Sequence, residues 1–241
     1  MKLLTADVCH LPVTDEITAW RAKTFDMCTA RITYRVPQMK AINNSVLLFE
    51  YVQATYPTNT WTKWIRDNYP APTLGASVGL ALNAWGCDGI FLDTPFENVP
   101  MPVLAVQSVK DMKDGVGAKL VSVNFGDADM WMGNYEKTRL ASAAIAEIAD
   151  VHFVEAAVRM DRPFDMAKWL KLRTLAGIWA DRGKKVVLGI YDPAPSRHDF
   201  ACALAFAAAR DGVYAYYRTK PGVPGEHPQT FEYNDLWELA S

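Results

Sequence analysis

The sequence predicts an α/β protein that folds as a single (β/α)8 TIM barrel over residues 1–241. Short apolar runs alternate along the chain with amphipathic segments, which is the element order of a parallel sheet covered by helices. Eight such units fit this length, and chains of roughly 200–250 residues commonly form one barrel domain. No internal repeat or long linker divides the chain, so we expect one domain.

The expected strands are short and rich in β-branched or aromatic residues, as buried strands are. Clear examples lie at residues 45–53, 89–93, 119–125, 151–155, 185–192 and 212–218, and weaker ones at 3–8 and 25–31. The short first run predicts an irregular first strand.

The segments between these runs are expected to be helices. They cover residues 14–23, 58–68, 77–85, 103–113, 134–149, 165–182 and 196–210. The first of them opens with Thr14, Asp15 and Glu16, which suit a helix N-cap and first turn. Only residues 233–239 remain for a reduced last helix.

An open, doubly wound sheet is the alternative architecture. That fold would favour a glycine-rich phosphate loop after the first strand, but Cys9-His10-Leu11-Pro12 follows it, and no G-x-G-x-x-G loop occurs elsewhere. The barrel is therefore the preferred prediction.

Composition and charge narrow the partners and the location. The formal net charge is −2, which gives no reason to expect nucleic acid or an anionic membrane as a partner. No apolar run approaches the ~18 residues of a membrane span, and the N-terminus turns polar too soon for a signal peptide. We expect a soluble protein, cytoplasmic, or phage- or cell-surface-associated if it belongs to a larger assembly; the oligomeric state is left open.

Polar side chains end most of the expected strands, where active sites of barrels lie. The candidates are Glu50, Asp93, Asn124, Glu155, Tyr191, Asp192, Tyr217 and Arg218. The four histidines are scattered and no two have zinc-ligand spacing. We therefore expect no metal and no cofactor, with Mg²⁺ bound by the strand-end carboxylates as the alternative that stays open.

Two of these residues, Asp93 and Glu155, stand out because each ends an otherwise apolar strand. Each shares a face with the residues two and four positions before it, since side chains alternate with period two. A carboxylate at the edge of an apolar core needs a partner, a raised pKa or a function. Helix capping or pairing with Arg139 or Arg159 is the structural explanation, but two such carboxylates on alternate strands favour a site.

Two carboxylates flanked by aromatic rings are what glycosidic bond cleavage requires. One carboxylate protonates the leaving oxygen, for which we favour Glu155, and the other attacks the sugar or activates water. Trp131, in a loop expected at residues 126–133, is predicted to stack on the sugar. Tyr56, Tyr191 and Tyr216 or Tyr217 are expected to line the cleft, and Asn124, Asp192 and Tyr217 to orient a carbohydrate substrate.

The run Trp85-Gly86-Cys87-Asp88-Gly89-Ile90-Phe91-Leu92-Asp93 resembles the "DGvflD" fourth-strand motif of a glycoside-hydrolase-like TIM-barrel family related to the endo-alpha-1,4-polygalactosaminidases. The order of elements over most of the chain is also similar. The resemblance implies polysaccharide hydrolysis with Asp93 and Glu155 as the catalytic pair. Chitinase-type barrels share this strand, but their motif continues to a glutamate where Pro95 stands.

Two other functions stay open at this point. A non-catalytic carbohydrate-binding or structural barrel module, for example of a phage or virion, would use the same aromatic residues. An isomerase or aldolase would need a phosphate site or a lysine at a strand end, whereas Lys184 and Lys185 begin a strand and Lys220 lies beyond the last one.

Overall fold

A curled sheet of parallel strands forms the centre of the molecule. The computed structural model describes residues 6–8, 14–30, 35–53, 60–93, 102–159, 162–192 and 212–219. Within these ranges eight parallel strands lie side by side in chain order, β1 to β8. They are β1 (Ala6–Val8), β2 (Met27–Ala30), β3 (Leu47–Gln53), β4 (Gly89–Asp93), β5 (Leu120–Asn124), β6 (Val151–Arg159), β7 (Lys185–Asp192) and β8 (Val213–Thr219). All eight predicted strands are confirmed, and the first is short as expected.

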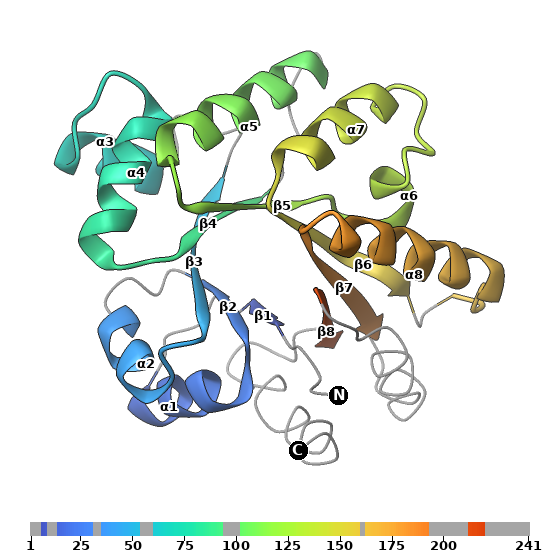
Figure 1. Ribbon diagram of the computed structural model, residues 1–241, viewed down its shortest axis with the longest axis horizontal. Coiled ribbons are helices and arrows are strands. Elements are labelled where there is room, and N and C mark those ends of the chain that lie inside the picture. The colour runs from blue at the N-terminus through green and yellow to red at the C-terminus, as the bar shows by residue number, and fades with distance from the viewer. Residues whose placement is uncertain are drawn as a thin grey trace.

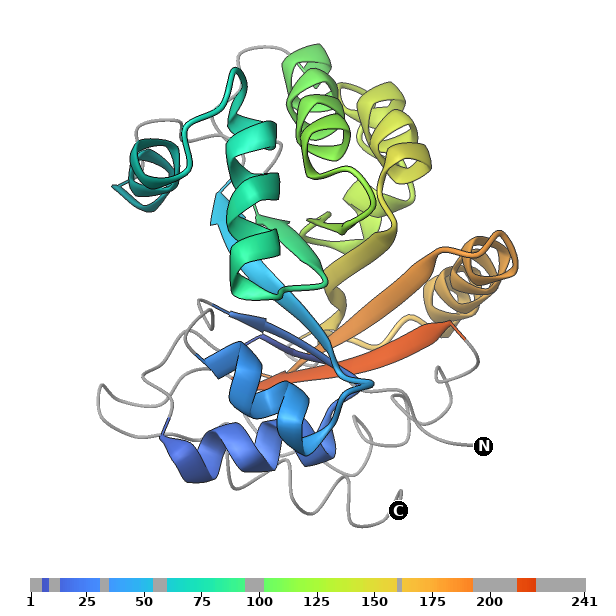
Figure 2. The same cartoon turned by 60° about the vertical axis from the view of Figure 1, so that its left-hand side comes forward.

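The sheet curls round so that its two outer strands face each other (Figures 1 and 2). Cα atoms of β1 and β8 come within 8 Å of one another. Between the described residues of these two strands, however, no hydrogen-bonded ladder forms. The observed architecture is an α/β fold with a curled parallel sheet.

Helices cover the outside of this sheet, as Figure 1 shows. They are α1 (Asp15–Thr24), α2 (Val36–Ile42), α3 (Thr60–Asn68), α4 (Leu74–Trp85), α5 (Pro102–Val116), α6 (Ala128–Trp131), α7 (Arg139–Ile148) and α8 (Met166–Asp181). The helices predicted at 196–210 and 233–239 lie outside the described residues. None of the helices in the described ranges has the length and hydropathy needed to cross a bilayer.

One predicted helix boundary on the outer layer was wrong. Helix α7 begins at Arg139 rather than at residue 134, and its Leu140 is 77% exposed. On α3, Trp64 is 41% exposed, and its ring stacks on Trp61 and Trp85 at the surface of α3 and α4. Both side chains therefore lie toward the solvent side of their helices.

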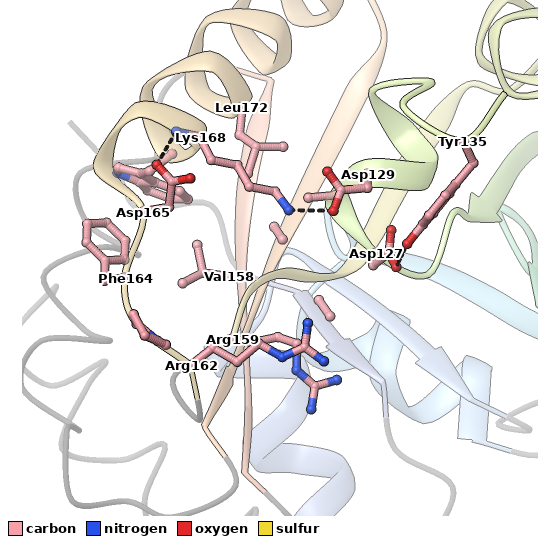
Figure 3. Close-up of a pocket in the computed structure, with 15 residues that line it drawn as sticks. Asp127, Asp129, Tyr135, Val158, Arg159, Arg162, Phe164, Asp165, Lys168 and Leu172 are labelled. Atoms are coloured by element: carbon pink, nitrogen blue, oxygen red, sulfur yellow. Dashed lines mark hydrogen bonds and ion pairs between the residues drawn. The ribbon is translucent and has the colours of Figure 1, made fainter. Parts of the chain in front are cut away.

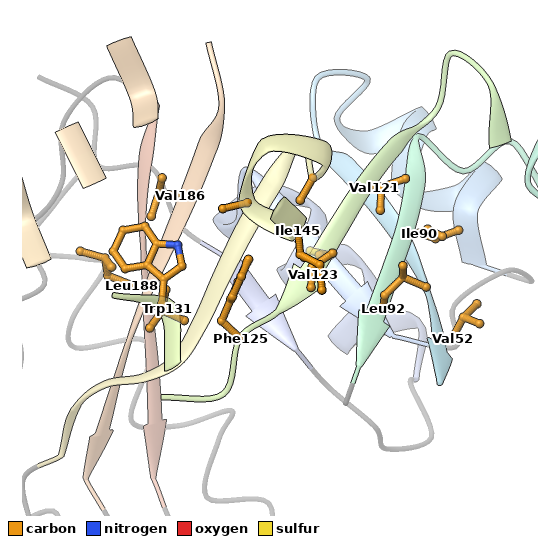
Figure 4. Packing of buried hydrophobic residues seen from close by; sticks show 14 of the residues in the cluster. Val52, Ile90, Leu92, Val121, Val123, Phe125, Trp131, Ile145, Val186 and Leu188 are labelled. Atoms are coloured by element: carbon orange, nitrogen blue, oxygen red, sulfur yellow. The ribbon is translucent and has the colours of Figure 1, made fainter. Parts of the chain in front are cut away.

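Period-two alternation divides the buried side chains into two layers. Phe49, Tyr51, Phe91, Phe153 and Val187 belong to one cluster of inward-facing residues. The alternate residues pack outward against the helices, and Figure 4 shows part of this outer layer. Because Phe91 and Phe153 share the inner cluster, Asp93 and Glu155 follow on the inner face of their strands, as predicted.

The N-terminal ends of the strands are tied together by two aspartates. Asp88 Oδ2 accepts the backbone N–H of Leu48 at 2.8 Å and pairs with Lys40 at 2.8 Å. Asp150 Oδ2 accepts the N–H of Val121 at 2.8 Å and pairs with Lys113 at 2.6 Å. The aspartate that opens the Asp88–Asp93 motif is thus structural, and only Asp93 lies at the C-terminal end of its strand.

A β-bulge changes the direction of the C-terminal half of β6. The register with β7 steps from Val154–Leu188 to Val158–Ile190, so β6 carries two extra residues there. Gly189 faces the bulge, and a Cβ on this residue would lie 2.1 Å from the carbonyl oxygen of Glu155. Bulges of this kind redirect side chains next to sites, and the close approach explains why glycine occupies position 189.

Candidate active site

Asp93, Asn124 and Glu155 meet at the C-terminal ends of β4, β5 and β6. The Asn124 Nδ2 atom donates to Asp93 Oδ1 at 2.8 Å and to Glu155 Oε2 at 3.0 Å. The Asn124 Oδ1 atom accepts the backbone N–H of Gly126 at 2.8 Å, which sets the orientation of the amide. Asn124 is 8% exposed and both carboxylate residues are half-buried. The structure therefore brings together three residues that the sequence singled out.

This shared amide limits the separation of the two carboxylates. One nitrogen contacts both groups, so the two oxygens lie no farther apart than the sum of 2.8 and 3.0 Å, or about 6 Å. The amide donates a hydrogen bond to each carboxylate and so holds the two groups at this separation.

Tyr51 completes the group and was missing from the predicted site. Its hydroxyl donates to Asp93 Oδ2 at 2.5 Å, from the C-terminal half of β3. The Tyr51 ring stacks on Phe91 at 5.9 Å between centroids, which fixes its direction. The alternation rule that selected Asp93 also places Tyr51 on the inner face with Phe49, and applying it to β3 would have found this residue.

Glu50, predicted to bind the substrate, lies on the opposite face of β3. Its strand neighbours Leu48 and Val52 pack outward in the helix-facing core, and Glu50 between them is fully buried. Burial of the Cys87 thiol, together with the nearby charge of Glu50, raises the pKa of this thiol to about 12. The prediction for Glu50 was wrong because a shift of one residue along a strand changes the face.

Trp131, predicted to stack on a sugar from a loop, is part of the core. It belongs to α6, is only 5% exposed, and donates from Nε1 to His152 Nδ1 at 3.2 Å. The α6 turn forms because Asp127 caps it, accepting the N–H of Met130 at 2.8 Å. The polar residues around Trp131 cap a short helix, so its ring points into the outer core (Figure 4).

The other predicted residues lie on β7 and β8 or between elements. Tyr191 pairs with Arg218 and Ile190 with Tyr217 in the backbone register, and Asp192 pairs with Thr219. The side chains of Tyr191, Asp192, Tyr216, Tyr217 and Arg218 are not among those described, and Tyr56 lies outside the described residues. Their predicted roles remain predictions.

The described part of the chain holds no group of three or more His, Cys, Asp or Glu side chains able to hold a metal ion. Two of the cysteines, Cys28 and Cys87, are free and buried. The chemistry available where Tyr51, Asp93, Asn124 and Glu155 meet is that of two carboxylates, an amide and a phenol.

Sheet and site together define an α/β protein with a carboxylate pair at the C-terminal edge of a curled parallel sheet. No protein-family model matches the chain, and no curated protein matches it in sequence. Solved structures similar to it include 2,3-dimethylmalate lyase, a member of the PEP mutase/isocitrate lyase superfamily. That likeness has a TM-score of 0.53 at 10% identity and covers 98% of this chain and 90% of the lyase.

A second similar structure is the GH18 chitinase ChiB from the chitin utilization locus of Flavobacterium johnsoniae. The TM-score is 0.53 at 11% identity, over 95% of this chain and 100% of the chitinase. Both neighbours are enzymes with TIM-barrel folds. At these identities the likeness concerns the fold alone.

Proposed function

We propose that the protein is a retaining glycoside hydrolase that cleaves a polysaccharide or glycan, with Asp93 and Glu155 as its carboxylate pair. The observation that carries this proposal is the Asn124 amide, which donates to both carboxylates and holds their oxygens within about 6 Å. Carboxyl groups about 5–5.5 Å apart are typical of retaining enzymes, and separations of about 6.5–9.5 Å of inverting ones.

The hydrogen bonds divide the two roles. Asp93 accepts one donor on each oxygen, from Tyr51 and from Asn124, and an ionised carboxylate only accepts. Asp93 is therefore assigned as the nucleophile that attacks the anomeric carbon. Glu155 protonates the leaving oxygen and afterwards removes a proton from the water that releases the sugar.

The scaffold proposed for this chemistry is a closed (β/α)8 barrel. The approach of β1 to β8 and the two TIM-barrel neighbours support closure. The resemblance of residues 85–93 to the polygalactosaminidase-related family supports the same catalytic pair, because the two catalytic carboxylates of that family correspond to Asp93 and Glu155. Amino-sugar polymers therefore belong in the first substrate panel, beside neutral and acidic ones.

The test compares the purified protein with Asp93→Asn and Glu155→Gln, which keep the shape of each side chain. We expect reducing ends to be released from one polymer class, with turnover lowered by at least about 10³-fold in each variant, as loss of a nucleophile or general acid implies. NMR of the product, recorded before mutarotation, should show the same anomeric configuration as the substrate. Undiminished turnover in either variant, or an inverted product, would contradict the assignment.

Glycan binding without hydrolysis is the other outcome that the experiment can reveal. If the unaltered protein binds a polymer but releases no reducing ends from it, and Asp93→Asn binds equally well, the chain is a carbohydrate-binding barrel module.

A further inference from the structure

Gly126 lies opposite Glu155 at the C-terminal end of the sheet. Beyond the end of β5, an isolated bridge pairs Asp127 with Ala156 in the same register that β5 already has with β6. That register places Gly126 beside Glu155, although β7 shifts against β6 at the bulge on the other side. The glycine is therefore opposite the proposed acid in the sheet and two residues from Asn124 in sequence.

The two backbone polar groups of Gly126 hold the two sides of the site. Its N–H donates to Asn124 Oδ1 at 2.8 Å, which leaves the Nδ2 end of this amide directed at the carboxylates. Its carbonyl oxygen accepts the N–H of Ala156, the residue directly after Glu155, at 2.9 Å. One residue thus orients the bridging amide and fixes the strand segment that carries the proposed acid.

Backbone conformation, and not lack of space, explains the glycine at position 126. Its φ is +69°, in the left-handed region that residues with a Cβ rarely adopt. A Cβ built on Gly126 would meet no heavy atom of the described residues within 4 Å, its two chain neighbours aside. Replacement by alanine therefore introduces no clash, and its effect comes from a change in backbone direction that turns the N–H and the carbonyl away from their partners.

The chain after Gly126 is fixed to the outer layer. Asp127 accepts the hydroxyl of Tyr135 at 3.0 Å, and Asp129 accepts Lys168 Nζ of α8 at 2.7 Å (Figure 3). These four residues line a cavity between β6 and α8. Because β5 holds the segment on one side and these contacts hold it on the other, the peptide groups of Gly126 have little freedom to turn.

We propose that Gly126 is a positioning residue of the carboxylate pair, whose left-handed backbone aims the Asn124 amide at Asp93 and Glu155. The inference rests on the proposed function. Gly126 contributes no group to the reaction itself and acts through the amide of Asn124 and the backbone next to Glu155. Turnover therefore depends on the φ angle of this residue and not on the size of its side chain.

The test compares Gly126→Ala with Gly126→Asn, because asparagine adopts the left-handed region several-fold more readily than alanine. We expect Gly126→Ala to lower kcat on the cleaved polymer at least about tenfold, with KM within about threefold of the unaltered protein. Gly126→Asn has the larger side chain and should nevertheless keep kcat within about threefold. The opposite order of the two variants would overturn the proposal.

Gly117→Ala is the matched control. Gly117 has a φ of +63° and, like Gly126, no heavy atom of the described residues within 4 Å of a built Cβ. It lies between α5 and β5, at the opposite end of the sheet. The two alanine variants should lose similar stability in urea, while Gly117→Ala keeps its kcat. Equal losses of kcat per folded molecule in the two variants would overturn the positioning role.

NMR of the Asn124 side chain gives a readout that does not depend on turnover. In isotopically labelled protein its Nδ2 protons should exchange with solvent at least about tenfold faster in Gly126→Ala than in the unaltered protein, and at an unchanged rate in Gly117→Ala. In the unaltered protein the backbone amides of Gly126 and Ala156 should be protected from exchange. Exchange of both amides at the rate of an unfolded chain would overturn the proposal even if Gly126→Ala does not fold.

The two proposals fail in different ways. If the unaltered protein cleaves a polymer but Gly126→Ala and Gly117→Ala behave alike, the hydrolase remains and the positioning role is lost. If no polymer is cleaved, yet the Asn124 amide changes only in Gly126→Ala, the hydrolase is lost and Gly126 remains the residue that orients the amide.

Discussion

The side-chain amide of Asn124 joins Asp93 to Glu155, donating from one nitrogen to both carboxylates across three adjacent strands. Hydrogen bonds to charged groups are worth about 1.5–3 kcal/mol each. The geometry of the proposed reaction therefore depends on a residue that takes no covalent part in it.

Asn124→Asp should lower kcat by about 100-fold or more, because an isosteric carboxylate cannot donate to its neighbours and adds a third negative charge. Steady-state kinetics on the cleaved polymer measures this, with circular dichroism to confirm folding. Asn68→Asp makes the same change on the exposed end of α3 and should leave kcat unchanged. A kcat within threefold of the unaltered protein would show that the bridge has no catalytic role.

Tyr51→Phe should lower kcat about 10- to 100-fold, since it removes the hydroxyl donor to Asp93 and retains the ring that stacks on Phe91. The melting temperature of the variant should stay close to that of the unaltered protein, because the ring packing is kept. Tyr69→Phe, in the aromatic cluster of α3 and α4, is the control. Equal kcat values for the two variants would contradict a role for the Tyr51 hydroxyl.

Gly189→Ala should both destabilise the fold and displace Glu155. The added methyl would meet the carbonyl oxygens of Glu155 and Val154 at 2.1 and 2.8 Å, and overpacking of this kind costs about 1–3 kcal/mol. Urea denaturation measures the stability, and kcat is measured where the variant is fully folded.

Gly89→Ala is the comparison for this variant, because its methyl would meet backbone at 2.3 Å at the opposite end of the sheet. It should lower stability while leaving kcat per folded molecule near that of the unaltered protein. If the two variants lose kcat equally, the bulge of β6 does not position Glu155.

His152 should make the fold less stable in acid. Burial lowers its pKa from 6.5 to about 4, and its neutral form is held by Trp131 Nε1 and the carbonyl oxygen of Ala146. Between these two values the unfolded chain binds a proton that the folded chain excludes, so stability falls as pH drops from about 6.5 to about 4. The loss attributable to this group is about 3 kcal/mol.

The measurement is urea denaturation at several pH values for the unaltered protein and His152→Gln, whose amide can keep both hydrogen bonds without titrating. The difference in stability between the two proteins should shrink or reverse in favour of the variant as the pH falls through this window. A difference that is independent of pH would contradict a buried neutral His152.

Local pattern was sufficient for most of the fold. Hydrophobic runs and their period of two predicted eight strands, and alternation placed Asp93 and Glu155 on the inner face with Phe91 and Phe153. These features depend on the backbone of one strand at a time, so a single sequence contains them. The order of strands follows because consecutive parallel strands with helical crossovers lie side by side.

Tertiary packing decided the rest of the site. Glu50 and Tyr51 are neighbours in sequence, yet the register of β3 against β2 and β4 sends one into the helix-facing core and the other to Asp93. Trp131 lies among polar residues but packs against His152, because Asp127 caps a helix there. The period-two pattern of β3 separates Glu50 from Tyr51 once the inner face is known, whereas the contact between Trp131 and His152 joins two elements and follows from neither position alone.

The sequence by itself thus determined the parallel α/β architecture and the strand-end carboxylates, which depend on periodicity and on the cost of a charge beside an apolar core. Only the tertiary structure decided that one amide contacts both carboxylates, that the β6 bulge opposite Gly189 positions Glu155, and that the carbonyl of Gly126 accepts the N–H of Ala156 on β6. The physical reason is that each of these relationships joins residues of different elements, whose separation depends on how the strands and helices pack together.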